Sequence, residues 1–136
     1  MDKGEQASRA KGFLRLSRRE RQIMDVLFRL GRATVAEVQA ELPDPPSYSS
    51  VRALLRVLEE KGHIKHTEDG PRYVYEPTVS RDRAKTSALR HVMQTYFDGS
   101  VEEVVSALMH MSSAQLSDEE YQELARLIKK ARKEGR

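Results

Sequence analysis

Three prolines, Pro43, Pro45 and Pro46, interrupt a part of the sequence that otherwise has helical periodicity. Proline has no amide hydrogen to donate and its ring clashes with the preceding turn, so a helix cannot continue through this stretch. We therefore expect a short helix over residues 35–42 and a new helix within residues 46–62. Two helices joined by so tight a connection restrict the possible folds more than any other feature of the chain.

The expected helix starts before the prolines are marked by a hydroxyl residue with glutamate three positions later. Such a pair forms a capping box, in which each side chain accepts a hydrogen bond from a free backbone N–H group. Ser17 with Glu20 predicts a helix over residues 17–30, and Thr34 with Glu37 predicts the start of the short helix. Apolar residues recur every three or four positions after each pair, as helices with one buried face require.

The helix after the prolines has an apolar face and a polar face. Its apolar residues, which we expect to be buried, are Val51, Leu54, Leu55 and Leu58. The other face of its N-terminal half carries hydroxyl groups, small side chains and arginines, namely Ser47, Tyr48, Ser49, Ser50, Arg52, Ala53 and Arg56. A helix cap needs only one of these hydroxyl groups, so the face as a whole indicates contact with a partner.

A β-hairpin is expected directly after this helix. Residues 64–67 and 72–76 are β-prone runs, and the turn residues between them include Asp69-Gly70. The order helix, short helix, helix, hairpin predicts a mainly α fold, a winged helix-turn-helix domain with the hairpin as its wing. In such a domain the third helix enters the major groove of DNA by its N-terminal residues, and the wing flanks the DNA backbone.

Several side chains are placed to contact DNA in this arrangement. Arg52 and Arg56 lie about one turn apart and can reach a phosphate or a guanine edge. The residues expected to add backbone contacts, from the wing and from the first helix, are Arg72, Tyr73, Arg18 and Arg19. Winged helices also bind proteins, and a regulator of this kind can sense a small molecule between its domains, so both alternatives stay open.

Residues 80–134 are expected to form a helical dimerisation domain that follows a winged-helix domain over residues 14–79. Ser100 and Ser117 each open a further capping box. These helices carry more apolar residues than two short helices can bury alone: Val101, Val104, Val105, Leu108, Met109, Leu124, Leu127 and Ile128. Pairing with a second copy would bury them, and the alternative is that they fold back on their own winged helix. The polar residues 1–13 are expected to be a disordered arm.

Composition argues against several other classes of protein. The chain of 136 residues has a net charge of only +3 and no cysteine, which excludes disulfides and thiolate metal sites. It has neither an apolar run near the roughly 20 residues of a membrane span nor a signal-peptide core, so we expect a cytoplasmic protein. His63 and His66 would point to opposite faces of a strand, so no metal site is expected. No phosphate-binding loop or nucleophile motif is present, so we expect neither a cofactor nor an enzyme.

Several motifs occur together in a characteristic order. They are Leu16-Ser17 with the following "E..IM.VL" run, Ala36-Glu37-Val38, the stretch "YSSVRALLRVLEEKGHI", and the "Y.Y.P" of the wing at Tyr73, Tyr75 and Pro77. This pattern resembles the BlaI/MecI/CopY family of bacterial repressors, the penicillinase-repressor family. The later stretch "YFDGSVEEVVSALM" is similar to that family's link into its dimerisation helices, so the resemblance covers residues 14–128.

The resemblance implies a homodimer that binds a palindromic operator and blocks transcription. By position it assigns Ser49, Ser50 and Ala53 to the base-facing sites of the third helix, and Arg52 to a family arginine beside them. It also implies that the C-terminal helices form the dimer interface.

The resemblance further suggests how such a repressor is released. In the β-lactam branch, a membrane-bound sensor with a metalloprotease domain is involved, and the repressor is cleaved in its C-terminal helices. Alignment through Gly99 puts the corresponding bond near Ala107-Leu108, where the residue types depart from the Asn-Phe pair of the best-known members. The copper-responsive branch carries paired Cys-x-Cys motifs, and this chain has no cysteine, which argues against that mode.

Overall fold

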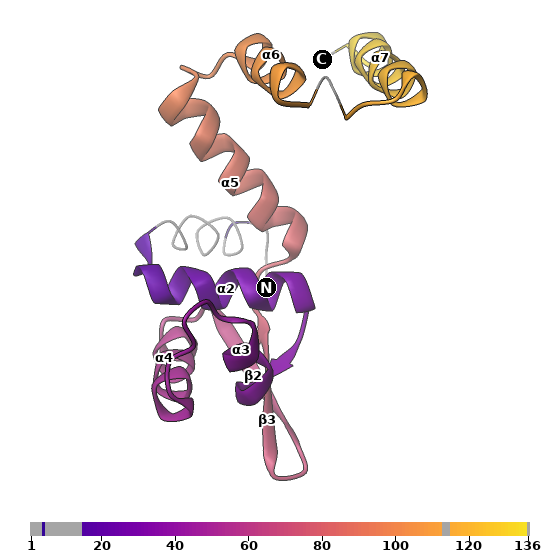
Figure 1. The fold of residues 1–136 in the computed structure, drawn as a ribbon. Coiled ribbons are helices and arrows are strands. Elements are labelled where there is room, and N and C mark those ends of the chain that lie inside the picture. The colour runs from indigo at the N-terminus through magenta and orange to yellow at the C-terminus, as the bar shows by residue number, and fades with distance from the viewer. Residues whose placement is uncertain (1–3, 5–14, 113–114, 136) are drawn as a thin grey trace. The chain divides into compact units, whose positions relative to one another are not determined.

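The computed structural model describes Gly4 and residues 15–112 and 115–135 (Figure 1). The predicted disordered arm lies outside the described residues, Gly4 apart. The chain divides into two compact units, Met1–His91 and Val92–Arg136, and each is described by itself.

The order of elements in the first unit confirms the predicted winged helix-turn-helix. Its described elements are α2 (Arg18–Leu30), β1 (Ala33–Thr34), α3 (Val35–Glu41), α4 (Tyr48–Glu60), β2 (Ile64–Asp69), β3 (Arg72–Pro77) and most of α5 (Arg81–Tyr96). The second unit holds the end of α5 together with α6 (Val101–Ser112) and α7 (Asp118–Lys133). The described chain is thus mainly helical, with one small sheet.

Capping boxes start the first two helices, as predicted. The Ser17 hydroxyl accepts a hydrogen bond from the Glu20 N–H at 3.2 Å, and the Glu20 carboxylate accepts one from the Ser17 N–H at 2.9 Å. Thr34 and Glu37 form the same pair of bonds at 3.2 and 2.9 Å. Each box satisfies two backbone donors that a helix start otherwise leaves free, so the helix bounds follow from local sequence.

The sheet is antiparallel with the strand order β1-β3-β2. The β2–β3 hairpin is the predicted wing. Strand β1 was not predicted, because two residues have no periodicity that sequence analysis can detect. Ala33 pairs with Tyr75 and Thr34 with Val74, so β1 ties the start of α3 to the wing.

The core of the first unit lies where α2, α3, α4 and the base of the hairpin meet. In Figure 1, α2 lies along one side of α3 and α4, and the hairpin extends away from it. The largest fully buried side chains are Ile23, Leu27, Val38, Val51, Leu55, Leu58 and Ile64. Three of the four apolar residues predicted for α4 are in this set, and the fourth, Leu54, is partly buried against it. The polar face of α4 is therefore directed away from the core.

The helices of the second unit have a different character. Among the residues described there, α6 and α7 contain no buried side chain. The capping box predicted at Ser117 is present. At Ser100 only half of it forms, because the Ser100 N–H donates to the Phe97 carbonyl at 2.8 Å and is no longer available to Glu103. In the described part of the chain, no helix is both long enough and apolar enough to cross a membrane.

Candidate nucleic-acid interface

The start of α4 presents a cluster of hydroxyl groups. Ser47 is the N-cap, and its hydroxyl accepts a hydrogen bond from the Ser50 N–H at 3.2 Å. The same hydroxyl lies 3.2 Å from that of Ser49 and donates to that of Ser50 at 2.9 Å. All three serines and Tyr48 are exposed. One hydroxyl thus caps the helix, and Ser49 and Ser50 lie on the surface beside it.

Arg52, Ala53 and Arg56 continue this exposed surface along α4. Neither arginine forms a hydrogen bond or an ion pair with a described residue. An exposed arginine that has no acidic partner keeps all of its N–H donors available for an anion. The polar face of α4 therefore combines small side chains with two arginines whose N–H donors remain available.

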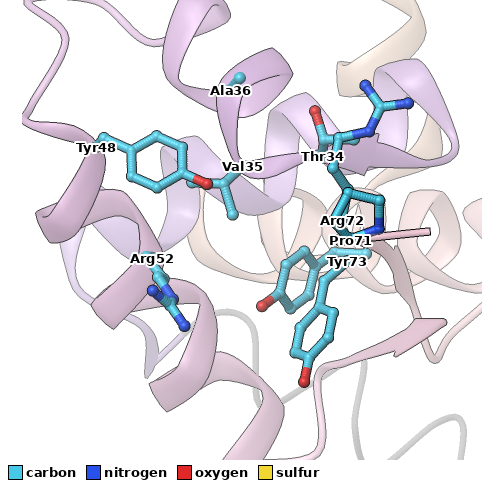
Figure 2. A pocket seen from close by; sticks show the side chains of 9 residues that line it. Thr34, Val35, Ala36, Tyr48, Arg52, Pro71, Arg72 and Tyr73 are labelled. Carbon is cyan, nitrogen blue, oxygen red and sulfur yellow. The ribbon is translucent and has the colours of Figure 1, made fainter. Parts of the chain in front are cut away.

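A groove of about 350 Å³ separates this part of α4 from the wing. Figure 2 shows Tyr48 and Arg52 of α4 on one side of it, and Pro71, Arg72 and Tyr73 of the wing on the other. Its remaining lining residues are Thr34, Val35, Ala36 and Tyr75. Two guanidinium groups and three phenols from separate elements thus line one groove, a composition suited to a polyanion with a sugar or base attached.

Two of the tyrosines that line the groove belong to the wing. The Tyr73 ring stacks on the ring of His66 with centroids 4.1 Å apart. Tyr75 is buried, and burial raises the pKa of its phenol above its ordinary value, an effect to which the nearby Glu59 carboxylate adds. The phenol therefore stays protonated at neutral pH and offers an O–H donor to the groove.

The basic run at the start of α2 divides into two kinds of residue. Arg18 is exposed, as a phosphate contact requires. The Arg19 guanidinium instead donates to the carbonyl oxygens of Pro43 and Asp44, at 2.7 and 2.6 Å, and to Gln22 at 3.0 Å. Arg19 thereby holds the proline-rich connection that leads into α4. The sequence predicts a phosphate contact for Arg19 and contains no signal for this long-range role.

An ion pair between a buried carboxylate and a half-exposed lysine fixes the other end of α4. Glu20, only 5% exposed, accepts a hydrogen bond at 2.9 Å from the ammonium group of Lys61, the C-cap of α4. This hydrogen bond and those from Ser17 hold the pKa of the Glu20 carboxyl at about 2, against an ordinary value of 4.5, although burial acts in the opposite direction. The first turn of α2 therefore holds the chain on both sides of α4, through Arg19 at the connection before it and through Glu20 at its C-cap.

The residues predicted for dimerisation lie on α6 and α7. Val101 and Ile128 are each 64% exposed, and Val105, Leu108 and Leu127 are also exposed. The other three predicted residues, Val104, Met109 and Leu124, are half-buried. Ala107 and Leu108, the predicted cleavage site, lie within α6. Among the described residues, no group of three or more His, Asp or Glu side chains is placed to hold a metal ion.

The model of one protein family, the penicillinase repressors, matches residues 16–130 of this chain. The chain belongs to the penicillinase repressor family. The motifs quoted from the sequence therefore identified the family correctly. Members of this family are transcription regulators that bind DNA and are not enzymes. This chain is therefore a DNA-binding transcriptional regulator.

Solved structures give a second comparison. The protein hsRosR-S4 matches with a TM-score of 0.56 and 19% identity, over 79% of this chain and 99% of that one. At this identity the likeness shows a shared fold alone. MepR, a transcription regulator of the Staphylococcus aureus multidrug efflux pump MepA, matches over 98% of this chain and 92% of its own, with 17% identity and a TM-score of 0.47. A comparison with curated protein sequences gave no match.

Proposed function

We propose that the protein is a homodimeric repressor that binds a palindromic operator through the N-terminal half of α4. In this proposal Ser49, Ser50 and Ala53 face the bases, and Arg52 and Arg56 contact a guanine edge or a phosphate. The remaining DNA contacts come from the α4 start, the wing and α2, through Ser47, Tyr48, Arg72, Tyr73 and Arg18. Arg19, predicted from the sequence as a further phosphate contact, serves instead to hold the connection before α4.

The observation that supports this role is the exposed polar face at the start of α4, which borders a groove lined by Arg52 and Arg72. Small hydroxyl residues let a helix approach the base edges closely, and guanidinium groups give the charged donors that phosphates and guanines accept. The exposed face at the start of α4 carries three serines, and serine is depleted at protein–protein interfaces, which favours DNA over a protein partner.

The exposed apolar residues of α6 and α7 support the homodimer. Val101, Leu108, Leu127 and Ile128 lie open to solvent in a single copy. Such surface is stabilised by association, and a two-fold dimer presents two copies of α4 to an inverted repeat.

We further propose that a signal-dependent event releases the repressor from DNA. The candidate event is cleavage between Ala107 and Leu108. This bond lies inside α6, so the helix must unwind locally before a protease can hold it in an extended form. The proposed partner for this step is a membrane-bound sensor metalloprotease, and the proposed setting is the cytoplasm. Cutting within α6 would separate part of the dimerisation surface from α7.

Selection from random duplex DNA, with the oligomeric state recorded in parallel, tests the proposal. We expect the parent protein to enrich an inverted repeat as a dimer. Arg52→Ala should weaken binding to that repeat by about 1–3 kcal/mol and relax the base preference near its contact. Arg18→Ala should weaken binding to all sequences alike and reduce the salt slope by about 1.

Arg126→Ala is a matched control for both variants. It removes the same charge from an exposed position on α7, in the second unit. We expect operator affinity close to that of the parent. A parent protein that enriches no sequence, or an Arg52→Ala variant that binds the selected repeat as well as the parent, would contradict the assignment of α4.

A further inference from the structure

His66 joins the wing to the far end of α4. It lies on β2, and its Nδ1 atom is 2.6 and 2.8 Å from the two carboxylate oxygens of Glu59 in the last turn of α4. Because a carboxylate can only accept, the Nδ1–H group donates a hydrogen bond to Glu59. Both side chains are about 30% exposed, so the contact is shielded from water on most sides.

The same imidazole packs against both tyrosines that the wing contributes to the groove. His66 pairs directly with Tyr75 across the hairpin, so the two rings share one face, and their centroids are 5.8 Å apart. Tyr73 stacks on His66 at 4.1 Å with an interplanar angle of 12°. His66 does not line the groove itself, yet it contacts Glu59 on α4 and two of the side chains that do.

The opposite face of the hairpin has its own attachments. Arg32 donates to the hydroxyl of Thr67 at 3.2 Å and lies 3.7 Å from the Glu76 carboxylate. Lys65 lies 3.5 Å from the same carboxylate. The backbone ladder of the hairpin and these contacts do not depend on the His66 side chain, so the wing should stay folded and attached to the first unit when that side chain is replaced.

We propose that His66 is a positioning residue for DNA binding, because its hydrogen bond to Glu59 holds the wing at a fixed distance and angle from α4 and its stacking fixes the ring of Tyr73 within the wing. The inference rests on the proposed function. Arg52 and Arg72 stand on separate elements, and the spacing of phosphates along a DNA strand is fixed. A wing held in place presents both arginines together, whereas a wing that moves must be ordered on binding, which lowers affinity.

Four substitutions separate the parts of this arrangement. His66→Ala removes the hydrogen bond and the stacking, and His66→Phe keeps an aromatic ring on Tyr73 but loses the hydrogen bond. Glu59→Ala removes the acceptor, whereas Glu59→Gln keeps an acceptor oxygen for Nδ1. Glu60→Ala is the matched control, because it removes the same charge from the next, exposed position of α4.

The probe is the duplex enriched by the parent protein, with affinity and phosphate-ethylation interference measured on the full chain. We expect His66→Ala and Glu59→Ala to lose about tenfold in affinity, as the removal of one charge-assisted hydrogen bond predicts. Ethylation interference should disappear at the outer phosphates, which the wing touches, and persist at those beside the α4 contacts. Glu59→Gln should recover most of the affinity, and His66→Phe should fall between His66→Ala and the parent.

Two results would overturn the inference while leaving the proposed function in place. One is a His66→Ala variant that binds like the parent although Arg52→Ala does not. The other is an interference pattern that fades uniformly over wing and α4 phosphates, which a general loss of folding produces. If His66→Ala fails to fold, the two Glu59 variants still test the inference. Equal losses of DNA affinity in Glu59→Gln and Glu59→Ala would also overturn it. A parent protein with no DNA preference refutes the proposed function and this inference with it.

Discussion

The two units of the chain differ in how far they bury their apolar residues. In the first unit, α2, α3 and α4 each bury side chains completely, and Leu55 and Leu58 are 0% exposed. In the second unit, α6 and α7 bury none, although their apolar residues recur at the same helical spacing. Periodicity therefore reveals that a helix has an apolar face but not what covers that face. In the first unit the apolar faces of the helices pack against one another. We propose that the apolar faces of α6 and α7 pack against a second copy of the chain.

The largest expected effect comes from truncating one leucine in each unit. Leu55→Ala should lower the free energy of unfolding of the first unit by about 2–5 kcal/mol, because it leaves a cavity in a packed core. Leu127→Ala, on α7, should leave that free energy unchanged and weaken dimerisation about tenfold or more, as loss of a buried leucine from an interface predicts.

Hydrogen exchange of α4 amides and sedimentation over a range of concentrations measure the two effects separately. The comparison fails if Leu127→Ala destabilises α4 as much as Leu55→Ala does. That result would mean that the second unit packs on the first, the fold-back alternative that the sequence left open.

A second contrast concerns pH and the ion pair of Glu20 with Lys61. The folded-state pKa of Glu20 is about 2, below its ordinary value of 4.5, so its charged form is the one that folding stabilises. The contribution is complete above about pH 4.5 and is lost as the pH falls towards 2, and it amounts to about 3 kcal/mol. Glu20→Gln should remove this contribution at neutral pH and flatten the acid limb of the stability curve. Chemical denaturation at a series of pH values measures it.

Glu123→Gln in the second unit is the control for that experiment. Glu123 pairs with Arg126 at 2.6 Å, but both side chains are more than half exposed, and exposed pairs of this kind contribute about 0–1 kcal/mol. Equal losses of stability in the two variants would show that the burial of Glu20 does not increase the contribution of its ion pair.

The smallest expected effect is the loss of a helix cap. Ser17→Ala and Ser117→Ala each remove a capping box, at a cost of about 1 kcal/mol to the helix that follows. In the first unit α2 belongs to a cooperative core, so the Ser17 change should appear in global unfolding. The Ser117 change should appear as local fraying of α7, measured by hydrogen exchange, and as weaker dimerisation. A global effect of both substitutions would indicate one cooperative unit in place of two.

The local part of the fold could be predicted from sequence because its causes are local. Capping boxes at Ser17, Thr34 and Ser117 depend on residues three positions apart. The hairpin turn lies at Gly70 and Pro71, where Gly70 takes a φ of 62°. The exposed face at the start of α4 followed from the period of its buried residues. The family followed from motif order and spacing.

Contacts between distant segments gave no such signal. Strand β1 exists only because Ala33 and Thr34 meet β3, more than thirty residues away along the chain. The bonds of Arg19 to the α3–α4 connection depend in the same way on packing. The sequence places His66 three residues after His63 but does not indicate its acidic partner, because Glu59 lies on another element.

The bonds from Arg19 to the carbonyl groups of Pro43 and Asp44 should also affect the kinetics of unfolding. They close loops of 24 and 25 residues, and Asp44 is held there at φ 43°, in the left-handed region that most residues avoid. Contacts that depend on such a closed, strained loop are expected to form after the main folding barrier, so their loss accelerates unfolding and leaves refolding unchanged. We expect stopped-flow measurements on Arg19→Met to show this asymmetry. Arg19 would then set how long the connection into α4 keeps its shape, and not how quickly it forms.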